Sequence, residues 1–260
     1  MTDNSIPRPA SSIWNGPYLT WFEACNAAKN QDLSQTAFTS ERWLQRITQQ
    51  LLVYRNEFRQ AGIAQTPRPC NLPWVVALTS ACSIVDFGGS SGWAMDYLQN
   101  TLTSHKIKSY TIIELESVVD YMQESGLHGN IVNYQALDSP LGNCDLLYSS
   151  SVLQYFESNL PLLSLIDRVT PDFIFLEDTL AKGEEDFFAT QSYYGSAIPH
   201  RFLGLGNLLK DLSSKGYEEL ARCPYISPIL GVMKNLPMEN FPEELQLRYS
   251  VSILLRRVRD

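Results

Sequence analysis

The spacing of hydrophobic residues changes within one glycine-rich stretch, and this change predicts a strand that leads into a helix. Apolar and partly β-branched residues run from Cys82 to Phe87, which is typical of a strand buried in a sheet. Hydrophobic residues then recur at helical spacing from Trp93 to Leu98, and glycines crowd the turn between the two elements. This order brings backbone N–H groups, a helix amino end and the carboxylate of Asp86 to one edge of a parallel sheet. The stretch therefore predicts a small-molecule site.

Strand and helix patterns alternate through the rest of the chain. The other strand patterns cover residues 109–114, 131–134, 144–149, 173–176, 217–220 and 251–255. Five strand–helix alternations come first, and we expect the two closing strands to form a hairpin. This order predicts an α/β fold with a mostly parallel sheet.

Two helices are predicted ahead of this alternation. Thr20 and Glu23 have the spacing of a capping box, which indicates that a short helix begins there. A longer helical stripe lies between Ser40 and Gly62, and Gly62 is placed to end it.

A proline-bearing stretch, residues 65–73, predicts a stiff connector and the best domain boundary. We expect residues 1–73 to form an N-terminal helical appendage and residues 74–260 to form the main domain. The long helix of the appendage either packs on the main domain or forms a lid over the substrate site, and both roles stay open.

Composition and charge exclude several classes of protein. The chain has 260 residues, of which 44% are hydrophobic, and this is enough to bury a sizeable core. The net charge of −8 argues against a nucleic-acid partner, because phosphate binding needs a basic surface. The cysteines form no C-x-x-C pair, which indicates reduced thiols in a cytoplasmic protein. No apolar run approaches the length of a membrane span, so we expect no span and no secretion signal.

The positions of the glycines exclude two kinds of phosphate-binding loop. A dinucleotide fingerprint begun at Gly88 needs glycines at the second and fifth following positions, where the chain has Ser90 and Trp93. A Walker A loop is excluded because no G-K-[ST] follows the glycines. A nicotinamide-dependent reductase is therefore a poor interpretation.

A third pattern, acidic-x-G-x-G-x-G, fits better when its acid is placed on Asp86. Two of the three glycines that it needs are present, Gly88 and Gly92. Ser90 takes the place of the middle glycine, and we expect Gly89 beside it to supply the left-handed backbone that the turn requires. In this stretch the chain resembles the class I S-adenosylmethionine-dependent methyltransferases.

Glu114 is a second candidate for the same ligand. It ends a β-branched run and follows Gly92 by 22 residues, which is the separation that a strand–helix–strand unit gives. An acid at the end of the second strand can accept hydrogen bonds from both hydroxyls of a ribose. The other interpretation is a solvated glutamate at a strand end.

A third segment, residues 144–156, reads C-D-L-L-Y-S and then S-S-V-L-Q-Y-F. It resembles the fourth strand of the same superfamily and the loop that follows. The resemblance implies that Ser149 and Ser150 let the backbone approach the methionine part of the cofactor. It also implies an acid or amide after the third strand that meets the adenine amino group, and Gln135 and Asp138 both fit, with Asp138 slightly favoured.

Together these segments, within residues 80–258, imply S-adenosyl-L-methionine as the cofactor. They also imply a Rossmann-like, seven-stranded, mostly parallel sheet with one antiparallel strand and helices on both faces. The implied cofactor-binding residues are Asp86, Gly88, Gly89, Ser90, Gly92, Glu114, Asp138, Ser149 and Ser150.

Methyl transfer to a hydroxyl needs a group that removes the proton of the acceptor, and histidine is the commonest such side chain. His105 and His128 fall in predicted surface turns, whereas His200 follows the fifth strand on the side of the sheet that holds the cofactor. We therefore predict His200 as the general base; the alternative is an exposed or helix-capping histidine. The sequence contains no compact cluster of carboxylates and histidines, so we predict no metal site.

The segment 181–202 is long, aromatic and glycine-bearing, which predicts a substrate loop. The residues that we expect to orient the acceptor are Tyr193, Tyr194, Asp178 and Arg201.

Two short segments, W-N-G-P-Y and Y-Y-G-S-A-I-P, also resemble a bacterial group of methyltransferases associated with surface-polysaccharide biosynthesis. That resemblance implies a saccharide hydroxyl as the acceptor. Two functions stay open: O-methylation of a small hydroxylated metabolite or saccharide, and a non-catalytic S-adenosylmethionine-binding partner subunit of a biosynthetic complex. A homodimer is compatible with the sequence but is not indicated by it.

Overall fold

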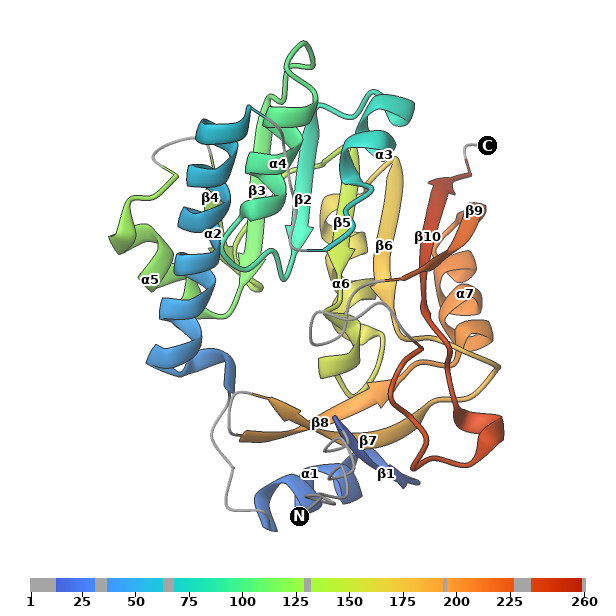
Figure 1. The fold of residues 1–260 in the computed structure, drawn as a ribbon. Coiled ribbons are helices and arrows are strands. Elements are labelled where there is room, and N and C mark those ends of the chain that lie inside the picture. The colour runs from blue at the N-terminus through green and yellow to red at the C-terminus, as the bar shows by residue number, and fades with distance from the viewer. Residues whose placement is uncertain are drawn as a thin grey trace, which may run out of the picture.

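The computed structural model describes residues 13–30, 37–62, 68–128, 132–193, 196–226 and 235–258, and its centre is a seven-stranded sheet (Figure 1). The strand order is β4-β3-β2-β5-β6-β10-β9. The strands are β2 (Ser83–Phe87), β3 (Ser109–Glu114), β4 (Asn133–Ala136), β5 (Leu146–Ser150), β6 (Phe173–Thr179), β9 (Tyr217–Tyr225) and β10 (Ser250–Arg257). Only β10 among them runs against its neighbours, because it pairs antiparallel with both β6 and β9. The predicted sheet, with one reversed strand and a closing hairpin, is confirmed.

Helices cover both faces of this sheet because its strands are apolar on both sides. Ile84 and Leu146 face one core and the next residues in the same strands, Val85 and Leu147, face the other. The first core is closed by α2 (Glu41–Ala61), α3 (Leu72–Thr79), α4 (Trp93–Thr101) and α5 (Glu116–Ser125). The second core is closed by α6 (Leu160–Val169) and α7 (Leu205–Ser214). This double cover is what a largely parallel sheet requires.

Several element boundaries differ from the sequence prediction. Strand β4 begins at Asn133, whereas the predicted strand begins at residue 131, which lies outside the described residues. Strand β9 continues past Leu220 because it pairs with β10 along its whole length. Helix α3 was not predicted; Pro73 lies in its first turn, where no backbone N–H is needed. The boundary expected at residues 73–74 therefore falls inside a helix.

A second, three-stranded sheet lies below the carboxyl ends of the parallel strands in Figure 1. Its strand order is β1-β7-β8, and we call it the platform: β1 (Trp14–Tyr18), β7 (Phe187–Tyr193) and β8 (Ser196–Phe202). The prediction of a loop over 181–202 is wrong, because most of that segment is the β7–β8 hairpin. The two strands of the hairpin pair with each other, and β7 also pairs with β1, which lies far away in the sequence.

Helix α1 (Trp21–Asn30) packs on the platform, with the rings of Trp21 and Phe188 6.1 Å apart. Its predicted capping box is confirmed: Glu23 N–H donates to Thr20 Oγ1 at 3.2 Å, and Thr20 N–H donates to the Glu23 carboxylate at 3.3 Å. The end of α2 at Gly62 is also confirmed, with φ of +65°.

Candidate cofactor and acceptor site

The turn over residues 88–92, here called the glycine turn, connects β2 to α4 and is tied to β3. Gly88 N–H donates to the carbonyl of Ile113 at 2.8 Å, and Gly92 N–H donates to the carbonyl of Gly89 at 3.0 Å. Ser90 has a φ of +54°, in the left-handed region that favours glycine. The expectation that Gly89 supplies this conformation is wrong, because Ser90 adopts it. Serine therefore adopts the left-handed conformation at the position where the pattern has its middle glycine.

Two of the glycines leave no room for a side chain. A Cβ added to Gly88 would lie 2.3 Å from Val152 Cγ2, on the segment that follows β5. A Cβ added to Gly89 would lie 2.4 Å from a carboxylate oxygen of Asp86. The turn is thus pressed between the end of β2 and the segment that follows β5.

Glu114, at the end of β3, contacts this turn directly. Its Oε1 accepts a hydrogen bond from Ser90 N–H at 2.9 Å, and its Oε2 accepts one from Leu115 N–H at 3.1 Å. Burial raises the pKa of Glu114, and the two backbone donors oppose that rise. Each carboxylate oxygen keeps lone pairs for further donors such as hydroxyl groups. The two features that the sequence singled out are therefore in direct contact.

Asp86 lies beneath the turn rather than facing solvent. It is 1% exposed, and Tyr110 Oη donates to its Oδ2 at 2.6 Å. Burial raises the pKa of Asp86 to about 7, with a contribution from the nearby charge of Glu114, while the Tyr110 hydrogen bond opposes the rise. Asp86 is thus placed to support the turn from below.

The two serines at the end of β5 have different environments. Ser149 Oγ donates to the carbonyl of Phe87 at 3.1 Å and so ties β5 to β2. The buried hydroxyl of Ser150 has no hydrogen-bond partner among the described residues. Ser150 is therefore the one of the pair with a free polar group at the carboxyl edge of the sheet.

The two candidates for the adenine amino group also differ. Asp138 is exposed, in the turn after β4. Gln135 lies in β4 next to Ile113 of β3, and its buried Oε1 has no hydrogen-bond partner among the described residues. A buried amide oxygen without a partner is costly unless a ligand or water fills the position.

The acceptor-side candidates are spread over β6 and the platform. Asp178 has a φ of +51°, accepts a hydrogen bond from Ser250 Oγ at 2.5 Å and lies 3.7 Å from the guanidinium of Arg68. Burial raises the pKa of Asp178, and Arg68 opposes the rise. The Arg68 guanidinium also lies 5.6 Å from the centre of the Trp93 ring, at the start of α4. Arg68 was not predicted to lie here, because its proline-rich surroundings carry no pattern typical of a binding site.

Arg201 is buried and is held by internal contacts. It bonds the Asp186 carboxylate at 3.1 Å and the Asn159 Oδ1 at 2.8 Å, which ties β8 to the start of α6. The ring of Tyr193 lies 5.3 Å from that of Phe38. Tyr194 lies outside the described residues.

His200 lies in β8, and none of its surface is exposed. Its ring is 5.6 Å from Trp14, 6.0 Å from Tyr155 and 4.6 Å from Phe202, measured between ring centres. Neither ring nitrogen has a hydrogen-bond partner among the described residues. Burial lowers the pKa of His200 to about 3, so the imidazole is neutral at physiological pH.

The prediction that His128 lies in a surface turn is wrong. It is buried, and its Nε2 lies 2.6 Å from the carbonyl oxygen of Ser91, inside the glycine turn. Its other ring nitrogen contacts Arg55 of α2 at 3.1 Å. Nothing local in the sequence marks this contact, because the two partners of the imidazole come from distant segments.

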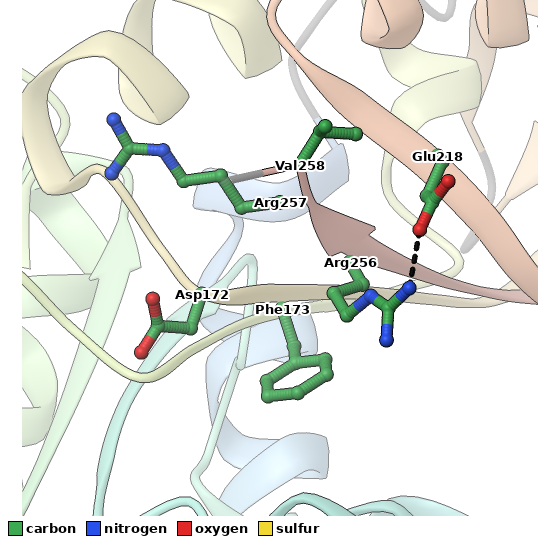
Figure 2. Close-up of a pocket in the computed structure, with 6 residues that line it drawn as sticks. All are labelled: Asp172, Phe173, Glu218, Arg256, Arg257 and Val258. Atoms are coloured by element: carbon green, nitrogen blue, oxygen red, sulfur yellow. Dashed lines mark hydrogen bonds and ion pairs between the residues drawn. The ribbon is translucent and has the colours of Figure 1, made fainter. Parts of the chain in front are cut away.

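A pocket at the other end of the sheet is separate from this site (Figure 2). It is lined by Asp172, Phe173, Glu218, Arg256, Arg257 and Val258. Phe173 is the first residue of β6, at the opposite end of that strand from Asp178. Arg256 and Glu218 face each other there as an ion pair (Figure 2).

Within the described ranges, no group of three or more His, Cys, Asp or Glu side chains is placed to hold a metal ion. No described helix is both long enough and apolar enough to cross a membrane.

Comparisons with known proteins give a likeness in structure and none in sequence. No protein-family model matches the chain, and no curated protein matches it. The structure of human N-acetylserotonin methyltransferase in complex with S-adenosylmethionine aligns over 92% of this chain and 67% of its own, with 14% identity and a TM-score of 0.53. An S-adenosylmethionine-dependent methyltransferase from Mesorhizobium loti covers 67% of this chain and 90% of its own, with 16% identity and a TM-score of 0.45. The strand order and the first of these likenesses show that the chain has the Rossmann-like fold of methyltransferases.

Proposed function

We propose that this protein is an S-adenosylmethionine-dependent methyltransferase that methylates a hydroxyl group of a small metabolite or saccharide. The observation that carries the proposal is the 2.9 Å contact between Ser90 N–H and Glu114 Oε1. It joins the carboxylate that would bind the ribose to a turn in which Gly88 and Gly89 have no room for a side chain, at the carboxyl edge of a parallel sheet. The fold likeness to a methyltransferase solved with this cofactor supports the same ligand.

The residues at this edge fit the parts of the cofactor. Glu114 would accept hydrogen bonds from the ribose hydroxyls, and the backbone of the glycine turn would lie along the amino-acid part. Gln135 and Asp138 are the candidates for the adenine amino group, and the buried, unpartnered Oε1 of Gln135 now favours the amide. The unpartnered hydroxyl of Ser150 faces the same edge from β5. When bound, the cofactor supplies a methyl group activated by a sulfonium, and the chain has to align the acceptor with it.

His200 is the residue that we propose to receive the proton of the acceptor. It is neutral, and both of its ring nitrogens lack partners, so it can accept a hydrogen bond from a hydroxyl. Its low pKa makes it a weak base, and proton transfer then occurs late, once the methylated oxygen has become strongly acidic. The surrounding rings of Trp14, Tyr155 and Phe202 exclude water and offer an apolar wall to the acceptor.

The platform supports a saccharide as one class of acceptor. W-N-G-P-Y is strand β1, and Y-Y-G-S-A-I-P spans the end of β7 and the start of β8. The two segments that resemble the polysaccharide-associated group therefore belong to one small sheet, in which β7 pairs with both β1 and β8. On this proposal, the N-terminal appendage contributes to acceptor binding through β1 and α1.

The test is calorimetry with S-adenosylmethionine and S-adenosylhomocysteine, with NAD as the control ligand, followed by transfer of a labelled methyl group to panels of saccharides and hydroxylated metabolites. Binding of both sulfur ligands, no binding of NAD and label in an acceptor hydroxyl are expected. Failure to bind either sulfur ligand would overturn the proposal.

The second candidate is a partner subunit that binds the cofactor without catalysis. It is favoured by the enclosure of His200 and by the internal contacts that hold Asp178 and Arg201. This function would be selected if the protein binds the cofactor but transfers no methyl group to any acceptor by itself. Addition of a catalytic partner should then produce methyl transfer.

A further inference from the structure

Arg55 connects α2 to the elements around the glycine turn. Its guanidinium forms an ion pair with both carboxylate oxygens of Asp96 on α4 and donates to the carbonyl of Leu127 at 2.8 Å. The same guanidinium lies 3.1 Å from His128 Nδ1. The side chains of Arg55 and Asp96 are 21% and 12% exposed, so water screens this ion pair only in part.

These contacts determine the tautomer of His128. A guanidinium can only donate hydrogen bonds, so Nδ1 must be the acceptor and carry no proton. The proton is then on Nε2, which donates to the carbonyl oxygen of Ser91 at 2.6 Å. Burial lowers the pKa of His128, and this favours the same neutral form.

The imidazole therefore holds the middle of the glycine turn. Ser91 lies between Ser90, whose N–H is bonded to Glu114, and Gly92, which precedes α4. A Cβ added to Gly92 would lie 3.0 Å from His128 Nε2, so the ring also packs directly against the turn. Because a peptide unit is planar, movement of the Ser91 carbonyl would also move the N–H of Gly92, which donates to the carbonyl of Gly89 at 3.0 Å and closes the turn.

We propose that Arg55 and His128 are positioning residues that hold the glycine turn in the conformation that binds the cofactor. Helix α2 of the N-terminal segment thereby contributes to cofactor affinity without touching the cofactor. The inference rests on the proposed function, because the ligand in question is S-adenosylmethionine. A turn that is already ordered loses less conformational freedom when the ligand binds, and this is the source of the affinity.

The contacts from Arg55 through His128 to Ser91 require a neutral imidazole, and this makes cofactor affinity depend on pH. The charged or titratable groups that face the ring are Arg55 from α2, Asp96 from α4 and Tyr134 from β4, the last with its ring centre 6.0 Å away. A proton on Nδ1 would place two donors, imidazolium and guanidinium, against each other. Asp96 lies 3.7 Å from Nδ1 and would attract the imidazolium, but its carboxylate is already bonded to Arg55. Protonation would therefore displace Arg55 and loosen the turn.

The experiment measures the dissociation constant of S-adenosylhomocysteine by calorimetry at about pH 7.5 and about pH 4.5, because burial lowers the pKa of His128 and the ring takes up a proton only below its ordinary range. The proteins are the wild type, Arg55→Ala, His128→Ala, His128→Gln and the control Arg59→Ala, which removes an exposed arginine from the same helix. Glutamine can donate to the Ser91 carbonyl but takes up no proton. We expect Arg55→Ala and His128→Ala to weaken binding by about tenfold at the higher pH, which is the effect of one lost charge-assisted contact. Arg59→Ala should bind as the wild type does.

The pH comparison separates positioning from a general loss of structure. Wild type should bind more weakly at the lower pH, and His128→Gln should lose this dependence while it keeps the affinity of the wild type at the higher pH. The inference is overturned if Arg55→Ala and His128→Ala bind as the wild type does, or if His128→Gln retains the full pH dependence. If wild type binds neither sulfur ligand at either pH, the proposed function itself fails, and that result is distinct from both.

Discussion

Ser90 N–H donates a 2.9 Å hydrogen bond to Glu114 Oε1 across the gap between the β2 turn and the end of β3. Ser90 is the residue that replaces the middle glycine of the acidic-x-G-x-G-x-G motif. Glu114 is the acid that we expect to bind the ribose. Ser90 has a left-handed backbone, and its N–H reaches the carboxylate at the end of β3. The geometry of the turn and the position of the carboxylate are thus interdependent.

Replacement of Glu114 by alanine should weaken binding of S-adenosylmethionine by about 2 kcal/mol or more, because two charge-assisted hydrogen bonds to ribose are lost. Glu114→Gln is the matched control, since it keeps one acceptor oxygen and should lose only part of the affinity. Calorimetry on both variants checks the prediction. Equal affinity in all three proteins would remove Glu114 from the site.

Replacement of Ser90 by glycine should leave stability unchanged or raise it slightly, because glycine adopts a φ of +54° without strain. Gly88→Ala should destabilise the protein, since its φ is +76° and its Cβ would lie 2.3 Å from Val152. Urea denaturation of both variants gives the comparison. A large loss of stability in Ser90→Gly would mean that the serine side chain has a structural role.

Asp86 should make the free energy of unfolding fall as pH rises from about 4 to about 7. Its pKa is raised to about 7 in the folded protein from 3.8, so in this range the folded state binds the extra proton. The contribution is complete below the unfolded value and is lost as pH passes the folded one, at no more than about 1.4 kcal/mol per pH unit. Asp86→Asn keeps an acceptor for Tyr110 and cannot titrate, so its stability relative to wild type should increase over this range. A constant difference across the range would contradict the assignment.

Replacement of His200 by leucine should abolish methyl transfer and raise stability by about 1 kcal/mol, because two buried nitrogens without partners are removed. Affinity for S-adenosylhomocysteine should stay close to that of wild type. Phe202→Leu, in the same aromatic cluster, is the control and should lose stability because it leaves a cavity. Full activity in His200→Leu would assign proton removal to another group.

Local patterns of hydrophobic and polar residues predicted most of the fold. The run that ends in Glu114 is β3 with the predicted bounds, because a β-branched segment ending in an acid suits a buried strand with its end at the sheet edge. The β7–β8 hairpin was missed because Phe187–Tyr193 has no clear alternation, and its edge is covered by β1, from the other end of the chain.

Residues that act over long distances in the sequence could not be predicted. The two partners of the His128 ring are 73 and 37 positions away, so only the folded chain brings them together. The closeness of Asp86 and Glu114, by contrast, could be predicted from the sequence, because one strand–helix–strand unit has a regular length. The closeness of the glycine turn to Glu114 was therefore predicted, whereas the burial of His200 inside the platform was not.

The pairing of β1 with β7 also affects how the protein is made. Asn15 and Thr190, which meet across these strands, are 175 residues apart, so most of the chain must leave the ribosome before the first strand finds its neighbour. Until then the aromatic side chains of β1 have no sheet to pack on, and we expect them to be exposed and able to bind chaperones. The platform is therefore expected to be the last part of the nascent protein to form, after the layers around the central strands have assembled.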